Sequence, residues 1–233
     1  MPLSTKLLAT TLVLLSGLFF STQASAVSVT FDFTQHTGWT SGDVAFHSGT
    51  HSVNVGAFNG GNNSSVASNR IAIGSNAYGL VACSGRTYSG YSGCYGDGHV
   101  IDSSGRDEDI KFTFNQDVTL ESMTVTYWDN SDDFSLFVGT DVRVTDQSIF
   151  GQGHERTYTF SGLGGDLTDS MFYIGARGNG DDFKLRSLTV NIPDAPPGGE
   201  VPEPSTVVLL GSGLAGLAYW RKKKGTQSSA VDR

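Results

Sequence analysis

Two short acidic segments carry the side chains best suited to binding a metal ion. The first contains Asp129, Asn130, Asp132 and Asp133, and the second contains Asn179, Asp181 and Asp182. Calcium takes about six to eight oxygen ligands from carboxylates, amide side chains and backbone carbonyls, so a weak calcium site is one hypothesis. Turn formation is the favoured alternative, because Asp, Asn and Gly also supply the hydrogen bonds and left-handed backbone of tight turns. Neither segment has the glutamate that ends an EF-hand loop.

The two acidic segments resemble each other in sequence. Residues 129–136 are DNSDDFSL, and residues 178–185 are GNGDDFKL. Each segment follows an apolar stretch and begins another, so both are expected at comparable positions in a two-sheet fold. A third acidic run, residues 106–109, precedes an apolar stretch and is expected to be a solvated entry to a strand with a local salt bridge.

The sequence contains few of the residue patterns that are typical of catalytic sites. Two carboxylates can hydrolyse a glycosidic bond when one of them has a raised pKa, but acidic side chains in polar, glycine-rich turns are not expected to be desolvated. His47 and His51 are four residues apart, in a segment that contains Gly and Thr rather than a zinc-binding helix. The sequence has no nucleophile elbow, and the body has neither a phosphate-binding loop nor a complete dinucleotide fingerprint. We therefore expect no enzyme, and no cofactor apart from the calcium considered above.

Aromatic side chains offer a second kind of binding surface. Sugar-binding proteins place flat Trp and Tyr rings against the apolar face of pyranose rings. The candidates here are Trp39, Tyr78, Tyr88, Tyr91, Tyr95 and Trp128. Packing in the core or in loops is the alternative role of the same rings.

The charge of the chain excludes one class of partner. The whole chain has a formal net charge of −8. Residues 27–200 hold 21 acidic side chains against 9 basic ones, which leaves −12 for that segment. Nucleic-acid binding depends on neutralising phosphates with Lys and Arg, so nucleic acid is not an expected partner.

The body of the chain has the pattern of β-strands. Apolar and polar residues alternate over residues 27–33, 110–114, 123–127 and 134–138. Such alternation is typical of half-buried strands. In residues 183–192 the alternation changes phase, which predicts a β-bulge near Arg186 and Ser187. Short strands, glycine-rich turns and the lack of a helical period predict an all-β fold with a single, jelly-roll-like β-sandwich domain.

Cys83 and Cys94 are the two cysteines of the chain. In an exported protein, two cysteines this close in sequence predict a disulfide. The bond would close a loop of about a dozen residues and stabilise the fold by roughly 2–3 kcal/mol. Free thiols are the alternative, and two thiols without a matching histidine pair do not favour zinc.

The two ends of the chain are predicted to be targeting segments. Lys6, an apolar stretch and the sequence Ala24-Ser25-Ala26 predict an N-terminal signal peptide. The uncharged stretch Val207–Trp220 precedes a basic cluster and predicts a transmembrane helix with its positive end in the cytoplasm. The predicted organisation is a signal peptide (1–26), a β-sandwich domain (27–192), a proline-rich linker (193–204), a transmembrane helix with the basic cluster (205–224) and a cytoplasmic tail (225–233).

The C-terminal segment resembles the PEP-CTERM sorting signal that bacterial exosortases recognise. The resemblance rests on Val201, Pro202, Glu203 and Pro204, on the apolar stretch, and on the basic cluster Arg221, Lys222, Lys223 and Lys224. Residues 96–139 also resemble the central region of a group of exosortase-dependent surface proteins, through the GDGH sequence at 96–99 and the strand containing Phe112 and Phe114. The resemblance implies a precursor anchored in the inner membrane, processing by exosortase, and delivery to the cell surface or extracellular matrix.

Three functions follow from these observations. The leading hypothesis is a non-enzymatic surface or extracellular-matrix protein that is exported and sorted through its C-terminal signal. The first alternative is a module that binds exopolysaccharide, with or without the help of calcium. A secreted hydrolase is the least favoured alternative.

Overall fold

The computed structural model describes residues 25–35, 37–60, 65–66, 68–84, 86–87, 94–95, 100–103, 107–129, 131–148, 154–178, 180–193 and 204–227. The chain divides into two compact units. One unit is the body, Ser25–Pro193. The other contains the helix α2 (Pro204–Gln227).

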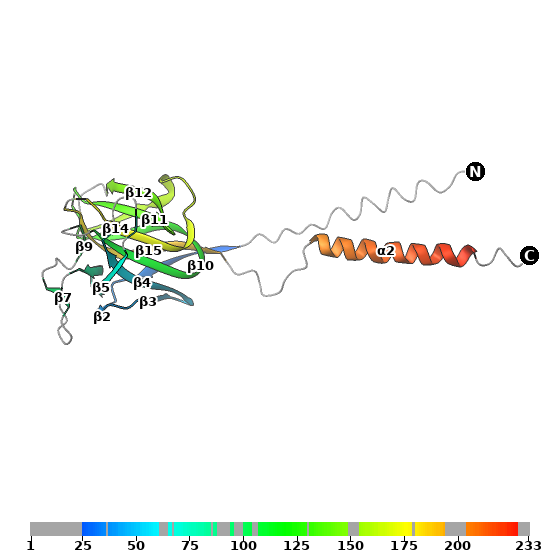
Figure 1. The fold of residues 1–233 in the computed structure, drawn as a ribbon, viewed down its shortest axis with the longest axis horizontal. Coiled ribbons are helices and arrows are strands. Elements are labelled where there is room, and N and C mark those ends of the chain that lie inside the picture. The colour runs from blue at the N-terminus through cyan, green and yellow to red at the C-terminus, as the bar shows by residue number, and fades with distance from the viewer. Residues whose placement is uncertain are drawn as a thin grey trace, which may run out of the picture. The chain divides into compact units, whose positions relative to one another are not determined.

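The described part of the body consists mainly of β-strands (Figure 1). They are β1 (Ala26–Asp32), β2 (Thr37–Thr40), β3 (Val44–Ser48), β4 (His51–Asn59), β5 (Asn69–Asn76), β6 (Gly79–Cys83), β7 (Arg86–Thr87), β8 (Cys94–Tyr95), β9 (Ile101–Asp102), β10 (Glu108–Thr126), β11 (Asp133–Val138), β12 (Asp141–Ser148), β13 (Glu155–Thr159), β14 (Thr168–Ala176) and β15 (Asp182–Pro193). A 3-10 turn, Phe160–Gly162, follows β13. The strands β7 and β8 pair with each other, and the other strands form one 13-stranded sheet.

The large sheet closes on itself. Along the sheet, β15 is followed by β6, β5, β4 and β10, and β10 then pairs with β15 again. These five strands therefore form a closed barrel, and β14, β11 and β12 continue the sheet beyond β10. The predicted jelly-roll-like β-sandwich is wrong. A sandwich keeps two sheets separate, whereas the pairing of β10 with β15 joins these strands into one closed sheet.

β10 must bend strongly to make this closure possible. Its first residue, Glu108, pairs with Ala176, and its last residue, Thr126, pairs with Lys184. The eight-residue step from Ala176 to Lys184 can span at most ~29 Å, whereas a straight strand of the length of β10 would span ~60 Å. The register against β14 shifts between Thr113 and Val118, which is where an irregularity of this kind lets a strand bend.

β15 contains the bulge that its sequence predicts. Ser187 pairs with Thr124 and Leu185 pairs with Val125, so Arg186 is the extra residue. Its carbonyl oxygen accepts a hydrogen bond from the backbone N–H of Phe33, at 2.9 Å. The bulge lets the apolar residues on both sides of Arg186 face the core.

Phenylalanine rings fill much of the core. Phe31, Phe33 and Phe112 are fully buried, and Phe46 is nearly so. The rings of Phe33 and Phe46 meet edge to face, with centroids 5.0 Å apart. Burying each such side chain contributes about 1.5–3 kcal/mol relative to leaving it exposed. These residues come from β1, β3, β10 and the segment after β1, so the core ties distant parts of the sequence together.

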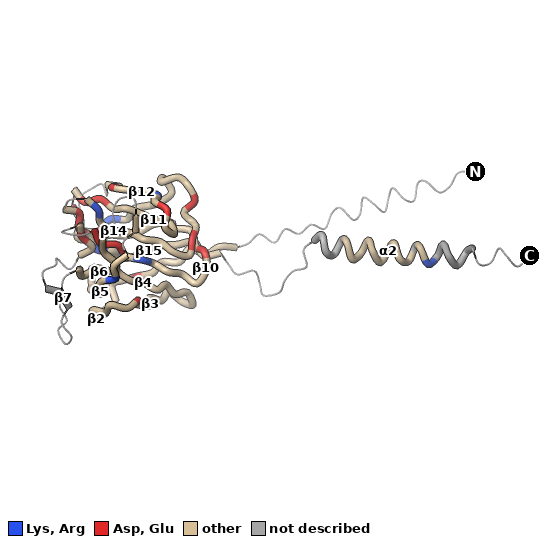
Figure 2. Tube along the Cα trace, viewed as in Figure 1, with Lys and Arg blue, Asp and Glu red and all other residues tan. Residues whose placement is uncertain are grey.

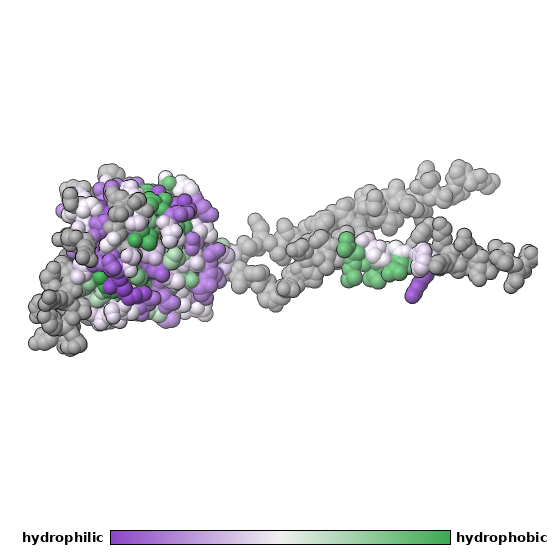
Figure 3. Space-filling model, viewed as in Figure 1, coloured by the Kyte–Doolittle hydropathy of each residue, from purple (hydrophilic) through white to green (hydrophobic). Residues whose placement is uncertain are grey.

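The helix α2 corrects the prediction of a transmembrane helix at 205–224. Among the residues that the structure describes, no helix combines the length and the apolar character needed to cross a membrane. Composition explains the result, because Gly211, Ser212, Gly213 and Gly216 dilute the apolar stretch and the basic cluster lies within the same helix. The described part of α2 nevertheless exposes apolar side chains, drawn green in Figure 3.

The turn between β5 and β6 depends on Gly79. Its φ is +131°, and a Cβ atom at this position would lie 2.4 Å from the backbone oxygen of Leu185. We expect Gly79→Ala to lower the free energy of unfolding by about 2–4 kcal/mol. Urea denaturation of the full-length protein, followed by tryptophan fluorescence, measures this change.

Gly162→Ala is the matched control for this substitution. A Cβ atom at Gly162 would have no heavy atom within 4 Å, so its effect should stay within about 0.5 kcal/mol. Equal losses of stability in the two variants would contradict the steric account of the β5–β6 turn.

Candidate functional site

The two acidic segments lie at the ends of strands that converge in the body. The first connects β10 to β11, and the second connects β14 to β15. Acidic positions, drawn red, gather with basic ones near the β14 label in Figure 2. Asn130 and Asn179 lie outside the described residues.

Each acidic turn accepts a hydrogen bond from the backbone of the other. The N–H of Asp182 donates to Oδ1 of Asp132 at 2.9 Å, and the N–H of Asp133 donates to Oδ1 of Asp181 at 3.0 Å. In the sequence similarity noted above, Asp132 corresponds to Asp181 and Asp133 to Asp182. The exchange is therefore reciprocal between matching positions. We call these four residues the paired-aspartate clasp.

Further hydrogen bonds hold each half of the clasp. The second carboxylate oxygen of Asp132 accepts a hydrogen bond from the backbone N–H of Asp129. In the other half, Ser103 accepts a hydrogen bond from the N–H of Asp181 at 3.1 Å through its hydroxyl oxygen. The N–H of Ser103 donates to the carbonyl oxygen of Asp181 at 3.0 Å. The clasp thus satisfies backbone groups where four strands begin or end.

The pKa values of the clasp reflect its burial. Desolvation raises the pKa of Asp181 to about 6, and the negative charges of Asp133, Asp132 and Asp146 add to the rise, although the hydrogen bond from Asp133 opposes it. Desolvation also raises the pKa values of Asp132 and Asp182.

The clasp uses carboxylates as hydrogen-bond acceptors. Within the described ranges, no group of three or more His, Cys, Asp or Glu side chains is placed to hold a metal ion. The carboxylates of Asp132 and Asp181 instead accept backbone N–H groups. The calcium hypothesis stays a prediction from sequence, since two of its candidate ligands lie outside the described residues.

A buried ion pair lies in the third acidic run. Asp109 and Glu108 are fully buried, so the expectation of a solvated strand entry is wrong. Asp109 pairs with Arg177, whose own side chain is completely buried. The guanidinium group of Arg177 also donates a hydrogen bond to the carbonyl oxygen of Ser65 at 2.8 Å. Its Cζ atom lies 4.4 Å from the ring centroid of Phe137. Sequence reasoning missed this pair, although an arginine directly after the apolar stretch of β14 was its available signal.

The aromatic candidates divide into exposed and buried residues. Trp128 is buried in the core, and Trp39 packs partly buried against Ala72 and Cys83. Tyr78 is 49% exposed and lies beside Tyr127, which is 52% exposed. Sequence reasoning placed Tyr127 on an apolar strand face, but its φ of +54° takes it out of the alternation. The side chains of Tyr88, Tyr91 and Tyr95 lie outside the described residues.

The predicted cysteine pair is partly described. Cys83 is 2% exposed and takes part in a disulfide. The side chain of Cys94 lies outside the described residues, so its pairing with Cys83 stays a prediction.

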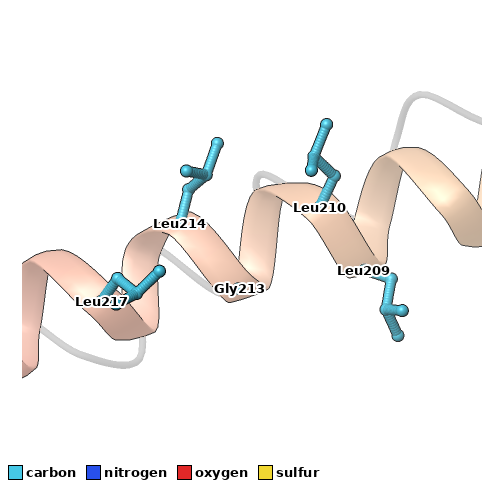
Figure 4. A pocket seen from close by; sticks show the side chains of 5 residues that line it. All are labelled: Leu209, Leu210, Gly213, Leu214 and Leu217. Atoms are coloured by element: carbon cyan, nitrogen blue, oxygen red, sulfur yellow. The ribbon is translucent and has the colours of Figure 1, made fainter.

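The helix α2 carries an exposed apolar surface. It is lined by Leu209, Leu210, Gly213, Leu214 and Leu217. Leu210 and Leu214 project to the same side of the helix, and Leu209 projects to the opposite side (Figure 4). Their side chains alternate with glycines and a serine, so the surface is shallow.

The pKa of Asp181 predicts a dependence of stability on pH. Because the folded-state pKa is raised from 3.8 to about 6, the folded protein binds this proton more tightly than the unfolded chain. The resulting stabilisation is complete below pH ~4 and is lost as the pH rises through ~6. We expect Asp181→Asn to weaken this dependence and to raise stability at pH 7 by about 1 kcal/mol, because the amide oxygen can still accept the N–H of Asp133.

Urea denaturation at pH 4.5, 5.5 and 7 measures the effect. Asp141→Asn, which changes an exposed carboxylate on β12, should leave the pH dependence as in the wild type. A stability of Asp181→Asn at pH 7 below that of the wild type would contradict the assigned cost of the buried charge.

The ion pair of Arg177 predicts a larger effect. Removing one partner of a buried pair leaves an uncompensated charge, so Arg177→Gln should lower the free energy of unfolding by about 3–5 kcal/mol. Arg70 forms an ion pair with Asp43 at 2.5 Å, with side chains 39% and 44% exposed. As the matched control, Arg70→Gln should cost less than about 1 kcal/mol. Similar losses in both variants, measured by urea denaturation, would refute the distinction.

Comparison with known proteins identifies the C-terminal segment. The PEP-CTERM protein-sorting motif matches residues 200–224, and Pro204, within that match, begins α2. Val201, Pro202 and Glu203 lie outside the described residues. No curated protein and no solved structure matches the chain. The motif indicates export, processing by exosortase and sorting to the cell surface, so residues 200–224 are a PEP-CTERM sorting signal.

Proposed function

We propose that the body is a non-enzymatic component of the cell surface or extracellular matrix. The observation that carries this proposal is the use of acidic side chains as structural bonding groups. Asp132 and Asp181 accept backbone N–H groups across the clasp, and Asp109 pairs with Arg177 inside the body. Carboxylates engaged in this way support the fold rather than a reaction.

A hydrolase is the competing function, and Asp181 is its best candidate for a general acid. A pKa raised to about 6 suits that role. However, Asp181 is 4% exposed, and the Oδ1 oxygen of its carboxylate accepts the N–H of Asp133 at 3.0 Å. A general acid must reach the leaving-group oxygen of its substrate, so this burial favours the non-enzymatic role.

Binding of exopolysaccharide is the second candidate function. The exposed pair of Tyr78 and Tyr127 favours it, because aromatic rings that stay exposed can contact the apolar faces of sugars. A protein sorted to the cell surface would meet such polymers there. Assistance by calcium is a separate part of this proposal, and repeating the binding measurement with a chelator tests it.

Exosortase is the partner on which delivery depends. We expect replacement of Pro202, Glu203 and Pro204 by alanine to leave the precursor unprocessed and to remove the protein from the surface and culture fractions. Mass spectrometry of these fractions from the native bacterium identifies the C-terminus of each form. Arg70→Gln, which changes an exposed ion pair of the body, serves as the control and should be processed normally.

Two results would contradict the proposal. Normal surface delivery of the triple-alanine variant would overturn the role of the sorting motif. Release of new reducing ends from polysaccharides by the purified wild-type protein would overturn the non-enzymatic role of the body.

A further inference from the structure

Two exposed tyrosines form an ordered aromatic surface on the body. Tyr78 lies in the turn between β5 and β6, and Tyr127 directly follows β10. Their rings meet edge to face, with centroids 5.0 Å apart and planes at 77°. About half of each residue remains exposed, although large aromatic side chains contribute most to stability when they are buried.

The backbone of Tyr127 is held in an unfavourable conformation. Its φ of +54° lies in the left-handed region, which is a genuine outlier for a bulky residue. Such a conformation costs about 1–3 kcal/mol and persists when the surrounding structure enforces it. Strain of this kind concentrates at binding sites, where it orients a side chain, and here it turns the ring of Tyr127 toward Tyr78.

The turn that carries Tyr78 is fixed by three contacts. Thr126 donates a hydrogen bond to the carbonyl oxygen of Tyr78 at 2.7 Å. The N–H of Tyr78 donates to the side chain of Asn76 at 2.9 Å. Gly79 lies directly against the backbone of Leu185. The two rings are therefore positioned before any ligand binds, which reduces the entropy lost on binding.

Lys184 supports the rings from the protein side. Its Nζ atom lies 4.1 Å from the ring centroid of Tyr127 and 5.5 Å from that of Tyr78. Lys184 is 6% exposed, whereas both tyrosines are about half exposed. The ammonium group of Lys184 therefore contacts the two rings from their buried side. The exposed side of the rings stays accessible to a ligand.

Two exposed carboxylates lie near the aromatic surface along the chain, because Asp129 is two residues after Tyr127 and Asp182 is two residues before Lys184. Asp182 and Asp129 are both exposed. Asp182 acts electrostatically on Lys184, and Asp129 acts on Asp182. Carboxylates accept hydrogen bonds from sugar hydroxyls, but they repel uronic acids and other anionic sugars. The acidic surroundings therefore select an uncharged ligand.

We propose that Tyr78 and Tyr127, together with the carboxylates of Asp129 and Asp182, bind an uncharged hexopyranose ring of an extracellular polysaccharide. The inference deepens the second candidate function above and rests on it. A pyranose ring presents an apolar face of C–H groups to the tyrosines and hydroxyl groups to the carboxylates. Trp39 and Trp128, which the sequence also suggested, are not part of this surface.

The test compares variants of the purified full-length protein by affinity gel electrophoresis. The gels contain laminarin, dextran, galactomannan or hydroxyethyl cellulose as neutral polymers, and alginate as the anionic polymer. We expect at least one neutral polymer to retard the wild type. Tyr78→Ala and Tyr127→Ala should each raise the Kd for that polymer about tenfold, whereas Tyr78→Phe and Tyr127→Phe should keep it within about twofold.

Val142→Ala is the matched control, because Val142 is an exposed apolar residue on β12, and its Kd should equal that of the wild type. Thermal denaturation checks the fold of each variant, and if Tyr127→Ala does not fold, Tyr78→Ala decides. If the Tyr78→Ala variant binds the polymer with the Kd of the wild type, this site is overturned, while the glycan-binding function stays in place. Failure of the wild type to bind any of the five polymers would overturn both the site and the glycan-binding function, whereas binding to alginate alone would overturn only the assignment of an uncharged ligand.

Discussion

β10 pairs along its first half with β4 and β14, and along its second half with β13 and β15. The strand can serve both sets because it bends where its register shifts, between Thr113 and Val118. The bend brings the two ends of β10 within reach of one eight-residue segment, Ala176 to Lys184. The positions of the clasp, of Arg177 and of the exposed tyrosines all depend on this bend, because each lies at or beside an end of β10.

Closing the sheet in this way buries backbone polar groups at the end of the barrel. Strands end and begin there, and their backbone N–H groups need acceptors once they are buried. The paired-aspartate clasp supplies carboxylate oxygens to the N–H groups of Asp133 and Asp182. Its cost is the burial of Asp181, because desolvation, together with the neighbouring negative charges, raises the pKa of this carboxyl group. Arg177 offsets part of the local negative charge, because it pairs with Asp109 and its charge opposes the rise that desolvation causes in the pKa of nearby Asp107.

At the same end of the barrel, some carboxylates stabilise the fold and others are accessible to a ligand. Asp132 and Asp181 are buried and hydrogen-bonded, whereas Asp129 and Asp182 are exposed. Tyr127 follows β10 directly, so the conformation that ends the strand also directs its ring outward. A rigid barrel that presents a few exposed side chains suits a protein whose sorting motif delivers it to the cell surface.

The sequence by itself determined the strands of alternating residues, the bulge at Arg186 and the sorting motif at residues 200–224, because each is a local pattern. It also showed the similarity between the two acidic segments, which the structure turns into reciprocal hydrogen bonds. The closed barrel in place of a sandwich, the burial of Asp109 and the outward ring of Tyr127 were decided by the tertiary structure. Alternation shows which face of a strand is buried, but it does not show which strands pair. The pairing of β10 with β14 brings Asp109 and Arg177 together, although they are 68 positions apart in the chain.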